Sequence, residues 1–208
     1  SADRLLSASF LKAGANDFVY RPYVIEELQC RIQHNIETLA QLQQLRVAAF
    51  SDYLTGLPNR AAWSEHLERE MQAWQAQGGH LLVAMLDLDH LKRINDNYGH
   101  LAGDKVLKIV ANELRKRLRG RDFIARFGGE EFVLILPGTD RASAYKTLEK
   151  LRMVVANHEW PLRQLTVSIG LASAEKFSDK KQLLEAADQV LYKAKTQGRN
   201  QTGVFSDS

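Results

Sequence analysis

The sequence predicts an α+β fold in which helices pack on a mixed β-sheet as a two-layer sandwich, close to a ferredoxin-like plan. From residue 80 onward, the periodic segments follow the order β-α-β-β-α-β-α-β, which interleaves helices with strands. Of the 208 residues, 45% are hydrophobic and 25% are charged, which is the usual balance of a globular protein with a full core. One long helical pattern precedes these segments.

This first helical pattern runs from Ile25 to about residue 50. Its apolar residues approximate a heptad seam about three heptads long, with one polar and one charged defect. One heptad position holds Ile25, Ile32, Leu39 and Arg46, and the partner position holds Leu28, Asn35, Leu42 and Ala49. The pattern fits a helix packed on its own domain and a dimerising stalk equally well.

The segment "DYLTGLPNR", residues 52–60, breaks this helix with Gly56 and Pro58. Asn59 can cap a following helix that reaches about Gln77. Asp52 and Arg60 are expected to pair across the turn. The next segment, "LLVAMLDL" at residues 81–88, has the continuous apolar character of a fully buried strand.

The remaining elements alternate in the same way. Residues 101–120 carry apolar side chains at four-residue spacing, which predicts a helix closed by Gly120. Strands at residues 122–127 and 130–137 form a hairpin across Gly128 and Gly129. A helix at 141–157, a strand at 165–172, a helix at 179–197 and a short strand at 203–205 complete the chain.

The overall composition excludes several classes of protein. A net charge of +3 is too small to indicate a nucleic-acid partner. The single cysteine, Cys30, excludes an internal disulfide and a cysteine-based zinc site, and it is typical of a reducing compartment. The longest apolar run, "LLVAML", is too short to span a membrane. We therefore expect a cytoplasmic protein with no membrane segment in this chain.

Two acidic clusters are the strongest candidates for chemistry. Asp87 and Asp89 lie two residues apart at the end of a buried strand, so both should point to the same side. Carboxylates in such a place can hold Mg²⁺, which prefers oxygen ligands and keeps waters for a phosphate-bearing substrate. The alternative is a strand that simply ends with acidic residues in solvent.

The second cluster follows the two glycines of "RFGGEEF", residues 126–132. A Gly-Gly turn permits positive φ and close approach of the backbone. If the hairpin lies beside the strand of Asp87, Glu130 or Glu131 can reach the same ion. Adjacent residues point to opposite faces of a strand, so one of the two should be a direct ligand. Otherwise the segment is a hairpin with a charged turn.

Several motifs in order resemble the GGDEF-domain diguanylate cyclases, in the GGEEF variant. The resemblance covers about residues 51–205 and implies a palm-type nucleotide-cyclase fold that condenses two GTP molecules into cyclic di-GMP and releases two pyrophosphates. It assigns residues 51–208 to this domain and residues 36–50 to a linker or stalk helix. The motifs are "DYLTGLPNR", "DLDHLKRINDNYGHLAGDKVL", "RFGGEEF", "TVSIG" and "ADQVLYKAKTQGRN".

The resemblance also implies roles for the acidic residues. Asp87 and Glu130 would bind Mg²⁺, or Mn²⁺ as an alternative ion, with the backbone carbonyl of Leu88 nearby. Two metal ions would activate the 3′-hydroxyl of one GTP and neutralise charge at the α-phosphate of the other. Glu131 would assist either in metal binding or in proton transfer, and the residues leave this choice open.

Asn95 and Asp104 match the family's guanine contacts. A carboxylate can accept from guanine N1–H and the 2-amino group, a donor pair that adenine lacks, so this pair favours GTP over ATP. After Gly103, however, Asp104 could instead cap the following helix. The glycines Gly128 and Gly129 would let the nucleotide lie against bare backbone.

Three cations match the family's triphosphate contacts: Lys92, Lys195 and Arg199. Each would supply positive charge where the leaving pyrophosphate develops negative charge. The alternative for Lys195 and Arg199 is to complement the C-terminus of the last long helix.

Arg119 and Asp122 form an Arg-x-x-Asp pair shortly before the hairpin. In the family, this spacing resembles the inhibitory site for the product cyclic di-GMP, where a guanidinium can bind guanine or phosphate and the carboxylate can accept from the guanine edge. The alternative is a basic helix end.

Joining two GTP molecules symmetrically implies a homodimer that brings two nucleotides together. The main rival function is a non-catalytic cyclic di-GMP receptor that uses Arg119 and Asp122. A nucleotidyl cyclase with another substrate is a third possibility.

Upstream, "AGANDFVYRP" resembles the end of a response-regulator receiver domain, with Arg21 where lysine usually stands. We therefore assign residues 1–35 to a receiver remnant and expect it not to sense phosphorylation.

Overall fold

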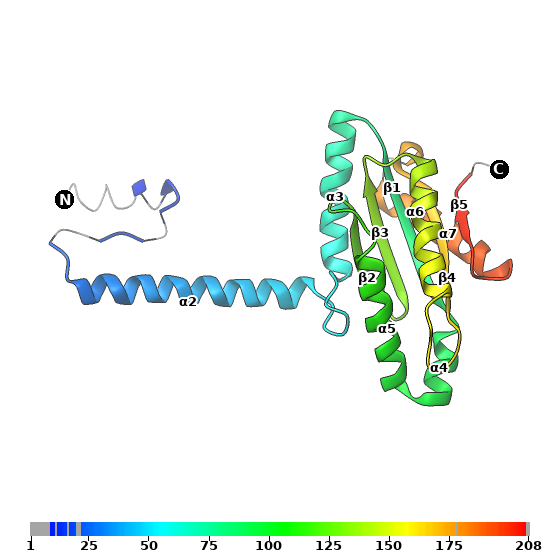
Figure 1. Cartoon of the computed structure of the whole chain (residues 1–208). Coiled ribbons are helices and arrows are strands. Elements are labelled where there is room, and N and C mark those ends of the chain that lie inside the picture. The colour runs from blue at the N-terminus through cyan, green and yellow to red at the C-terminus, as the bar shows by residue number, and fades with distance from the viewer. Residues whose placement is uncertain (1–8, 11, 16, 20–21, 178, 207–208) are drawn as a thin grey trace. The chain divides into compact units, whose positions relative to one another are not determined.

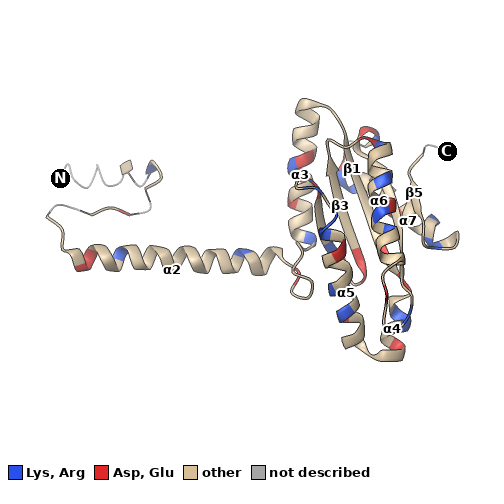
Figure 2. Cartoon of the chain, in the orientation of Figure 1, with Lys and Arg blue, Asp and Glu red and all other residues tan. Residues whose placement is uncertain are grey.

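The computed structural model describes residues 9–206 except residues 11, 16, 20, 21 and 178, and divides into two compact units, Ser1–Ala49 and Phe50–Ser208. Helix α2, Ile25–Phe50, has no buried residue, and Figure 2 shows few charges along it. Its exposed apolar side chains include Ile32, Leu39 and Leu42. Arg21 of the predicted receiver remnant lies outside the described residues. The boundary predicted at residues 35 and 36 stays a prediction.

The second unit is built on one mixed sheet of five strands in the order β2-β3-β1-β4-β5, as Figure 1 shows. The β2–β3, β3–β1 and β1–β4 pairs are antiparallel, and β5 is parallel to β4. The mixed sheet of a palm-type fold is confirmed. The strands are β1 Leu81–Asp89, β2 Phe123–Gly128, β3 Glu131–Pro137, β4 Thr166–Ser173 and β5 Thr202–Val204.

Helices cover both faces of this sheet, which adds a second helical layer to the sandwich that the sequence predicts. Helices α4, α5 and α6 pack on one face, and α3 and α7 pack on the other. The helices are α3 Arg60–Gln77, α4 Leu91–Tyr98, α5 His100–Arg115, α6 Arg141–Ala156 and α7 Lys180–Thr196, with a 3₁₀ turn at Ala174–Lys176.

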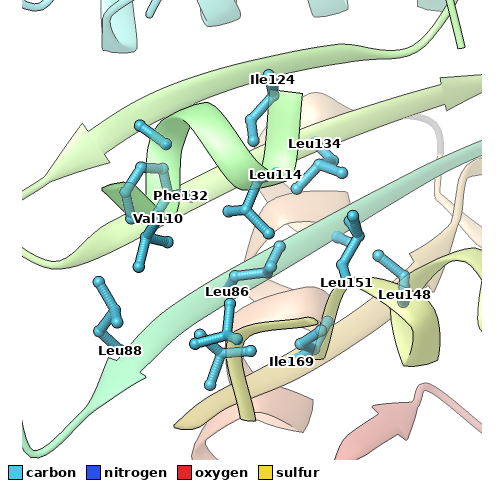
Figure 3. Packing of buried hydrophobic residues seen from close by; sticks show 14 of the residues in the cluster. Leu86, Leu88, Val110, Leu114, Ile124, Phe132, Leu134, Leu148, Leu151 and Ile169 are labelled. Carbon is cyan, nitrogen blue, oxygen red and sulfur yellow. The ribbon is translucent and has the colours of Figure 1, made fainter. Parts of the chain in front are cut away.

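All nine residues of β1 are buried because both faces of this central strand are covered. Leu86 and Leu88 pack with Val110 and Leu114 of α5 and with side chains of α6 (Figure 3). Val83 and its odd-numbered neighbours pack toward α3 and α7. The alternation explains the continuous apolar run in the sequence. It also places the acids at the end of β1 inside the protein.

Helix α7 approaches β4 closely at Gly170. A Cβ atom built on Gly170 would lie 2.1 Å from the backbone oxygen of Ala187 and 2.4 Å from the backbone nitrogen of Leu191. No side chain fits between the two elements, so this strand position requires glycine. The contact seats α7 with its last turn, which contains Lys195, near the end of β1.

The structure differs from the predicted helix boundaries around residues 91–120. Helix α4 was not predicted because it has only two turns and follows His90, which has a φ of 65°. Helix α5 begins at His100 and ends at Arg115, so the predicted helix closed by Gly120 was too long. Asp104 lies one turn inside α5 and does not cap it, so the capping interpretation was wrong.

The predicted ion pair between Asp52 and Arg60 is also wrong. Arg60 instead lies over the ring of Phe127, 4.5 Å from its centroid. Asp52 accepts hydrogen bonds from the backbone and hydroxyl groups of Thr55 and pairs with Arg126 of β2. The predicted cap is confirmed, since the Asn59 side chain accepts a hydrogen bond from the backbone of Ala62.

Candidate active site

Two carboxylates lie buried at the end of β1. Asp87 is 4% exposed and Asp89 is 2% exposed. Both contact α7 or the loop that follows it, Asp87 through Lys195 and Asp89 through Asn200, so they lie on the same side as the period of a strand predicts. Carboxylates so well removed from water need partners, and the two residues obtain them differently.

Asp89 is held by hydroxyl and amide donors. Thr166 and Ser168 of β4 donate hydroxyl hydrogen bonds of 2.7 and 2.8 Å to its carboxylate. The backbone N–H of Asn200 donates a third bond of 3.1 Å. The guanidinium of Arg199 lies 4.0 Å away. These donors tie β1, β4 and the loop after α7 together, so Asp89 is a structural anchor.

Asp87 depends on a cation. The Lys195 ammonium lies 2.8 Å from its Oδ2 atom. Burial nevertheless raises the pKa of Asp87 to about 6, with Lys195 opposing the rise and the charges of Glu130 and Glu131 adding to it. The pKa of Asp87 is thus raised even with an ammonium beside it. A further cation at this carboxylate would therefore stabilise its ionised form.

The Gly-Gly turn lies directly beside the end of β1. The backbone N–H of Leu88 donates to the carbonyl of Glu130 at 3.2 Å, and Asp87 faces Glu131 in the β1–β3 register. Burial raises the pKa of Glu130, and the charge of Lys195 opposes this rise. The predicted convergence of the hairpin with the strand of Asp87 is therefore present, and the charge of Lys195 acts on both Asp87 and Glu130.

Arg126 holds the other side of this turn. Its Nε and Nη2 atoms donate to the carbonyl of Gly129 at 3.0 and 2.7 Å. Its Nη1 atom contacts both oxygens of Asp52 at 3.1 Å. The two ionic side chains are 12% and 15% exposed. Sequence reasoning missed Arg126, because its partner lies 74 positions away and the spacing of charges does not indicate such a contact.

Asn95 of α4 and Asp104 of α5 lie in neighbouring helices. Asn95 packs against Gly103, where an added Cβ atom would lie 1.9 Å from its Oδ1 atom. This Oδ1 atom is buried and has no hydrogen-bond partner within the described structure. An unpaired buried oxygen is costly, so it marks a position where a ligand donor would be bound. Asp104 is partly exposed one residue after Gly103.

The other predicted site residues lie further out. Lys92 is exposed on α4, and the side chain of Arg199 is 44% exposed in the loop after α7. Arg119 and Asp122 follow α5, where the Arg119 backbone N–H donates to the Asp122 carboxylate at 2.9 Å. This bond closes the turn and leaves the Arg119 side chain exposed.

A family model described as diguanylate cyclase, GGDEF domain, matches residues 49–201. The chain belongs to the GGDEF family. Within the GGDEF domain, the matched region contains both carboxylate clusters, Arg126, Lys195 and the Arg119–Asp122 turn.

Characterised relatives of this GGDEF chain include diguanylate cyclase DgcP of Pseudomonas aeruginosa, which is 51% identical over 169 residues, 79% of this chain and 25% of that protein. Response regulator PleD of Caulobacter vibrioides is 34% identical over 212 residues, 95% of this chain and 47% of that protein. The chain thus spans between a quarter and half of the length of these two relatives.

Solved GGDEF structures share the fold. The coiled coil and GGDEF domain of DgcB from Caulobacter crescentus, in complex with c-di-GMP, has a TM-score of 0.80, 32% identity, and coverage of 86% of this chain and 98% of that one. The active GGEEF domain of a Vibrio cholerae diguanylate cyclase has a TM-score of 0.68 and 28% identity, covering 72% of this chain and 98% of that one.

The GGDEF site has the donors for a metal that retains part of its own water shell. Among the described residues, no three side chains of His, Cys, Asp or Glu form a group that could hold a metal ion. Two carboxylates plus backbone oxygens suit Mg²⁺, which usually takes one or two protein carboxylates and completes its shell with water and substrate phosphates.

None of the described helices combines the length and apolar composition of a membrane span.

The raised pKa of Asp87 predicts a specific pH dependence of stability. Its pKa rises from 3.8 to about 6 on folding, so the stabilisation from the protonated acid is present below the unfolded pKa and is lost as pH rises through the folded pKa. Relative to Asp87→Asn, the wild type should lose roughly 2 kcal/mol of unfolding free energy between about pH 4.5 and about pH 7.5. Denaturant unfolding in a metal chelator measures this difference, and parallel pH profiles would contradict it.

Proposed function

We propose that this GGDEF domain condenses two GTP molecules into cyclic di-GMP and releases two pyrophosphates. The observation that carries the proposal is that buried Asp87, paired with Lys195 at 2.8 Å, lies beside the turn of Glu130 and Glu131. The similarity to diguanylate cyclase DgcP supports the same activity. In each half-reaction, the 3′-hydroxyl of one GTP gives up its proton to solvent, and its oxygen forms a bond to the α-phosphorus of the other. The bond from that phosphorus to the β-phosphate oxygen breaks, and pyrophosphate leaves.

Asp87, Glu130 and the backbone carbonyl of Leu88 are the proposed ligands for Mg²⁺, with Mn²⁺ as an alternative. When bound, the metal would lower the pKa of the attacking hydroxyl and neutralise charge at the α-phosphate. Asp87 is buried and Glu130 is partly buried, so Asp87 above all holds its charge away from water, where electrostatic interactions are stronger. Glu131 lies beside this pair, and we assign it no single role in metal binding or proton transfer.

The proposed phosphate contacts are Lys195, Arg199 and Lys92. Lys195 already lies beside Asp87, so a triphosphate coordinated there would meet its ammonium. Arg199 is on the adjoining loop, exposed enough to reach a ligand. Gly129, with a φ of 28°, and Gly128 present backbone without side chains at the same turn. These groups would stabilise the leaving pyrophosphate.

Asn95 and Asp104 are the proposed guanine contacts. The unpaired Oδ1 atom of Asn95 can accept a hydrogen bond from a base, and the Asp104 carboxylate can accept from guanine N1–H and its amino group. Adenine has no such donor pair, so a site built to pair these acceptors would reject it.

Gly103→Ala should displace Asn95 with little loss of stability. The new methyl group would overlap the end of the Asn95 side chain, which can rotate away, and alanine favours a helix interior by about 1 kcal/mol over glycine. We expect the KM for GTP to rise about tenfold while the unfolding free energy changes by less than about 1 kcal/mol. Steady-state kinetics and denaturant unfolding test this. An unchanged KM would argue against Asn95 as a base contact.

The decisive experiment supplies Mg²⁺ with GTP or ATP and measures cyclic dinucleotide and pyrophosphate. We expect the wild type to form cyclic di-GMP from GTP and no cyclic product from ATP. We expect Glu130→Gln to form no cyclic di-GMP. A protein that binds cyclic di-GMP but makes none would instead be the receptor module that the sequence left as an alternative. A cyclic product from ATP would indicate another nucleotidyl cyclase.

Product inhibition at Arg119 and Asp122 is a separate proposal. The turn between them leaves the Arg119 guanidinium free to contact a ligand, while Asp122 is partly buried beside it. Cyclic di-GMP should bind there and slow the enzyme. In the same assay, Arg119→Ala should keep its initial rate as product accumulates. Equal slowing of wild type and variant would remove this site from the proposal.

Homodimer formation through α2 is the proposed route to catalysis. The exposed apolar residues of this helix are suited to a helical partner, and the DgcB structure pairs a coiled coil with its GGDEF domain. A variant without residues 1–50 should therefore need a higher protein concentration for the same specific activity.

The similarity to PleD, a response regulator, along most of the chain supports a receiver remnant at residues 1–35.

A further inference from the structure

Lys195 and a divalent metal ion would need the same oxygen. Its ammonium lies 2.8 Å from the Oδ2 atom of Asp87, whose side chain is 5% exposed. Mg²⁺ binds carboxylate oxygen at about 2.0–2.1 Å, so a metal on this oxygen would lie within a few ångströms of the ammonium. Two cations at such a separation repel each other strongly away from bulk water.

Lys195 is also able to leave. It lies in the last turn of α7, and its side chain is 31% exposed. Lysine carries its charge on a flexible four-carbon stem, so the ammonium can move without moving the helix. Among the described residues, Lys195 is the cation within ion-pair distance of Asp87.

Asp89 provides an internal comparison. Its carboxylate accepts hydrogen bonds from Thr166, Ser168 and the backbone of Asn200. Its nearest cation, the Arg199 guanidinium, lies further off at 4.0 Å. Asp87 has Lys195 in place of such donors. The same strand end thus contains one carboxylate that is fixed in the fold and one whose partner can be exchanged.

We propose that Lys195 competes with the metal for Asp87, and that the nucleotide triphosphate draws Lys195 away, so metal and GTP load together. The inference rests on the proposed metal site at Asp87. Its consequence is a coupling between the two ligands, because the phosphates that attract Lys195 also release the carboxylate for the metal. In the absence of nucleotide, the ion pair between Lys195 and Asp87 keeps the affinity for the metal low.

Binding of Mn²⁺ to the full chain, followed by electron paramagnetic resonance of the free ion, tests this without any turnover. In the absence of nucleotide, Lys195→Met should bind Mn²⁺ at least about tenfold more tightly than the wild type. Lys195→Arg should stay close to the wild type because it keeps a cation at Asp87. Lys193→Met, on an exposed position of the same helix, is the matched control and should change nothing.

A non-reacting GTP analogue with a methylene bridge between the α- and β-phosphates completes the experiment. It should tighten Mn²⁺ binding by the wild type more than by Lys195→Met. Equal Mn²⁺ affinities of wild type and Lys195→Met without nucleotide would overturn the competition. If Lys195→Met fails to fold, Lys195→Gln replaces it, and a wild type that binds Mn²⁺ equally with and without the analogue overturns the proposal. The metal site itself fails separately, if Asp87→Asn binds Mn²⁺ and analogue as the wild type does.

Discussion

Asp87→Asn is expected to lower cyclic di-GMP formation by at least about a thousandfold while the protein remains folded. The amide keeps the size of the carboxylate but lacks the charge that would hold a metal. Asp87 is buried at the end of the central strand and its pKa is raised to about 6, so its charge is costly to the fold. The substitution should therefore remove activity without a comparable loss of stability.

Product formation with saturating GTP and Mg²⁺, together with thermal unfolding of the same samples, measures both parts of this prediction. Glu159→Gln is a suitable control, because Glu159 is an exposed carboxylate in the segment between α6 and β4 and its loss should change neither quantity. Activity within about tenfold of the wild type would show that Asp87 is not part of the reaction centre.

Arg126→Met is expected to have the second largest effect, this time on stability. It would leave the Asp52 carboxylate, which is 15% exposed, without its cationic partner. Removing one member of a largely buried ion pair costs about 3 kcal/mol. The Gly129 carbonyl would also lose its two donors, and a turn released by even about 1 Å can slow a reaction up to about a hundredfold.

Asp52→Asn separates the two consequences. It weakens the ion pair but leaves the bonds from Arg126 to Gly129, so this variant should lose stability and keep most of its activity per folded molecule. Denaturant unfolding of both single variants and the double variant gives the coupling energy. Additive effects of the two substitutions, or equal activity losses in both, would contradict the role given to Arg126.

Much of the sheet could be predicted because its side chains follow simple periods. The apolar run of β1, the Gly-Gly turn and the four-residue apolar spacing of α5 each identify an element from local sequence alone. The acids at the end of β1 and at the turn were expected to converge, and the β1–β3 register brings Asp87 opposite Glu131. Helix α4 escaped prediction because two turns contain too few apolar residues to establish a period.

The partners of charged residues were the hardest feature to predict. Asp52 was assigned to Arg60, its neighbour across a turn, yet the fold brings Arg126 to it from a distant strand. Lys195 was expected to contact phosphate, and its ion pair with Asp87 depends on how closely α7 lies on β4 at Gly170. Tertiary packing decides such contacts, and a chain's local periods contain no information about them. The dimer and the inhibitory site stay predictions.

The anchoring of Asp89 has a consequence for motion. Three donors from β4 and the loop after α7 meet on one carboxylate that is 2% exposed. The loop around Arg199 is on the surface, but it cannot detach without removing one of the three hydrogen bonds to a buried charge. Local opening of this loop should therefore be rare and should accompany opening of the sheet itself. The proposed phosphate contact Arg199 is thus held on a stiff loop, whereas Lys195 carries its charge on a flexible side chain that is paired with Asp87.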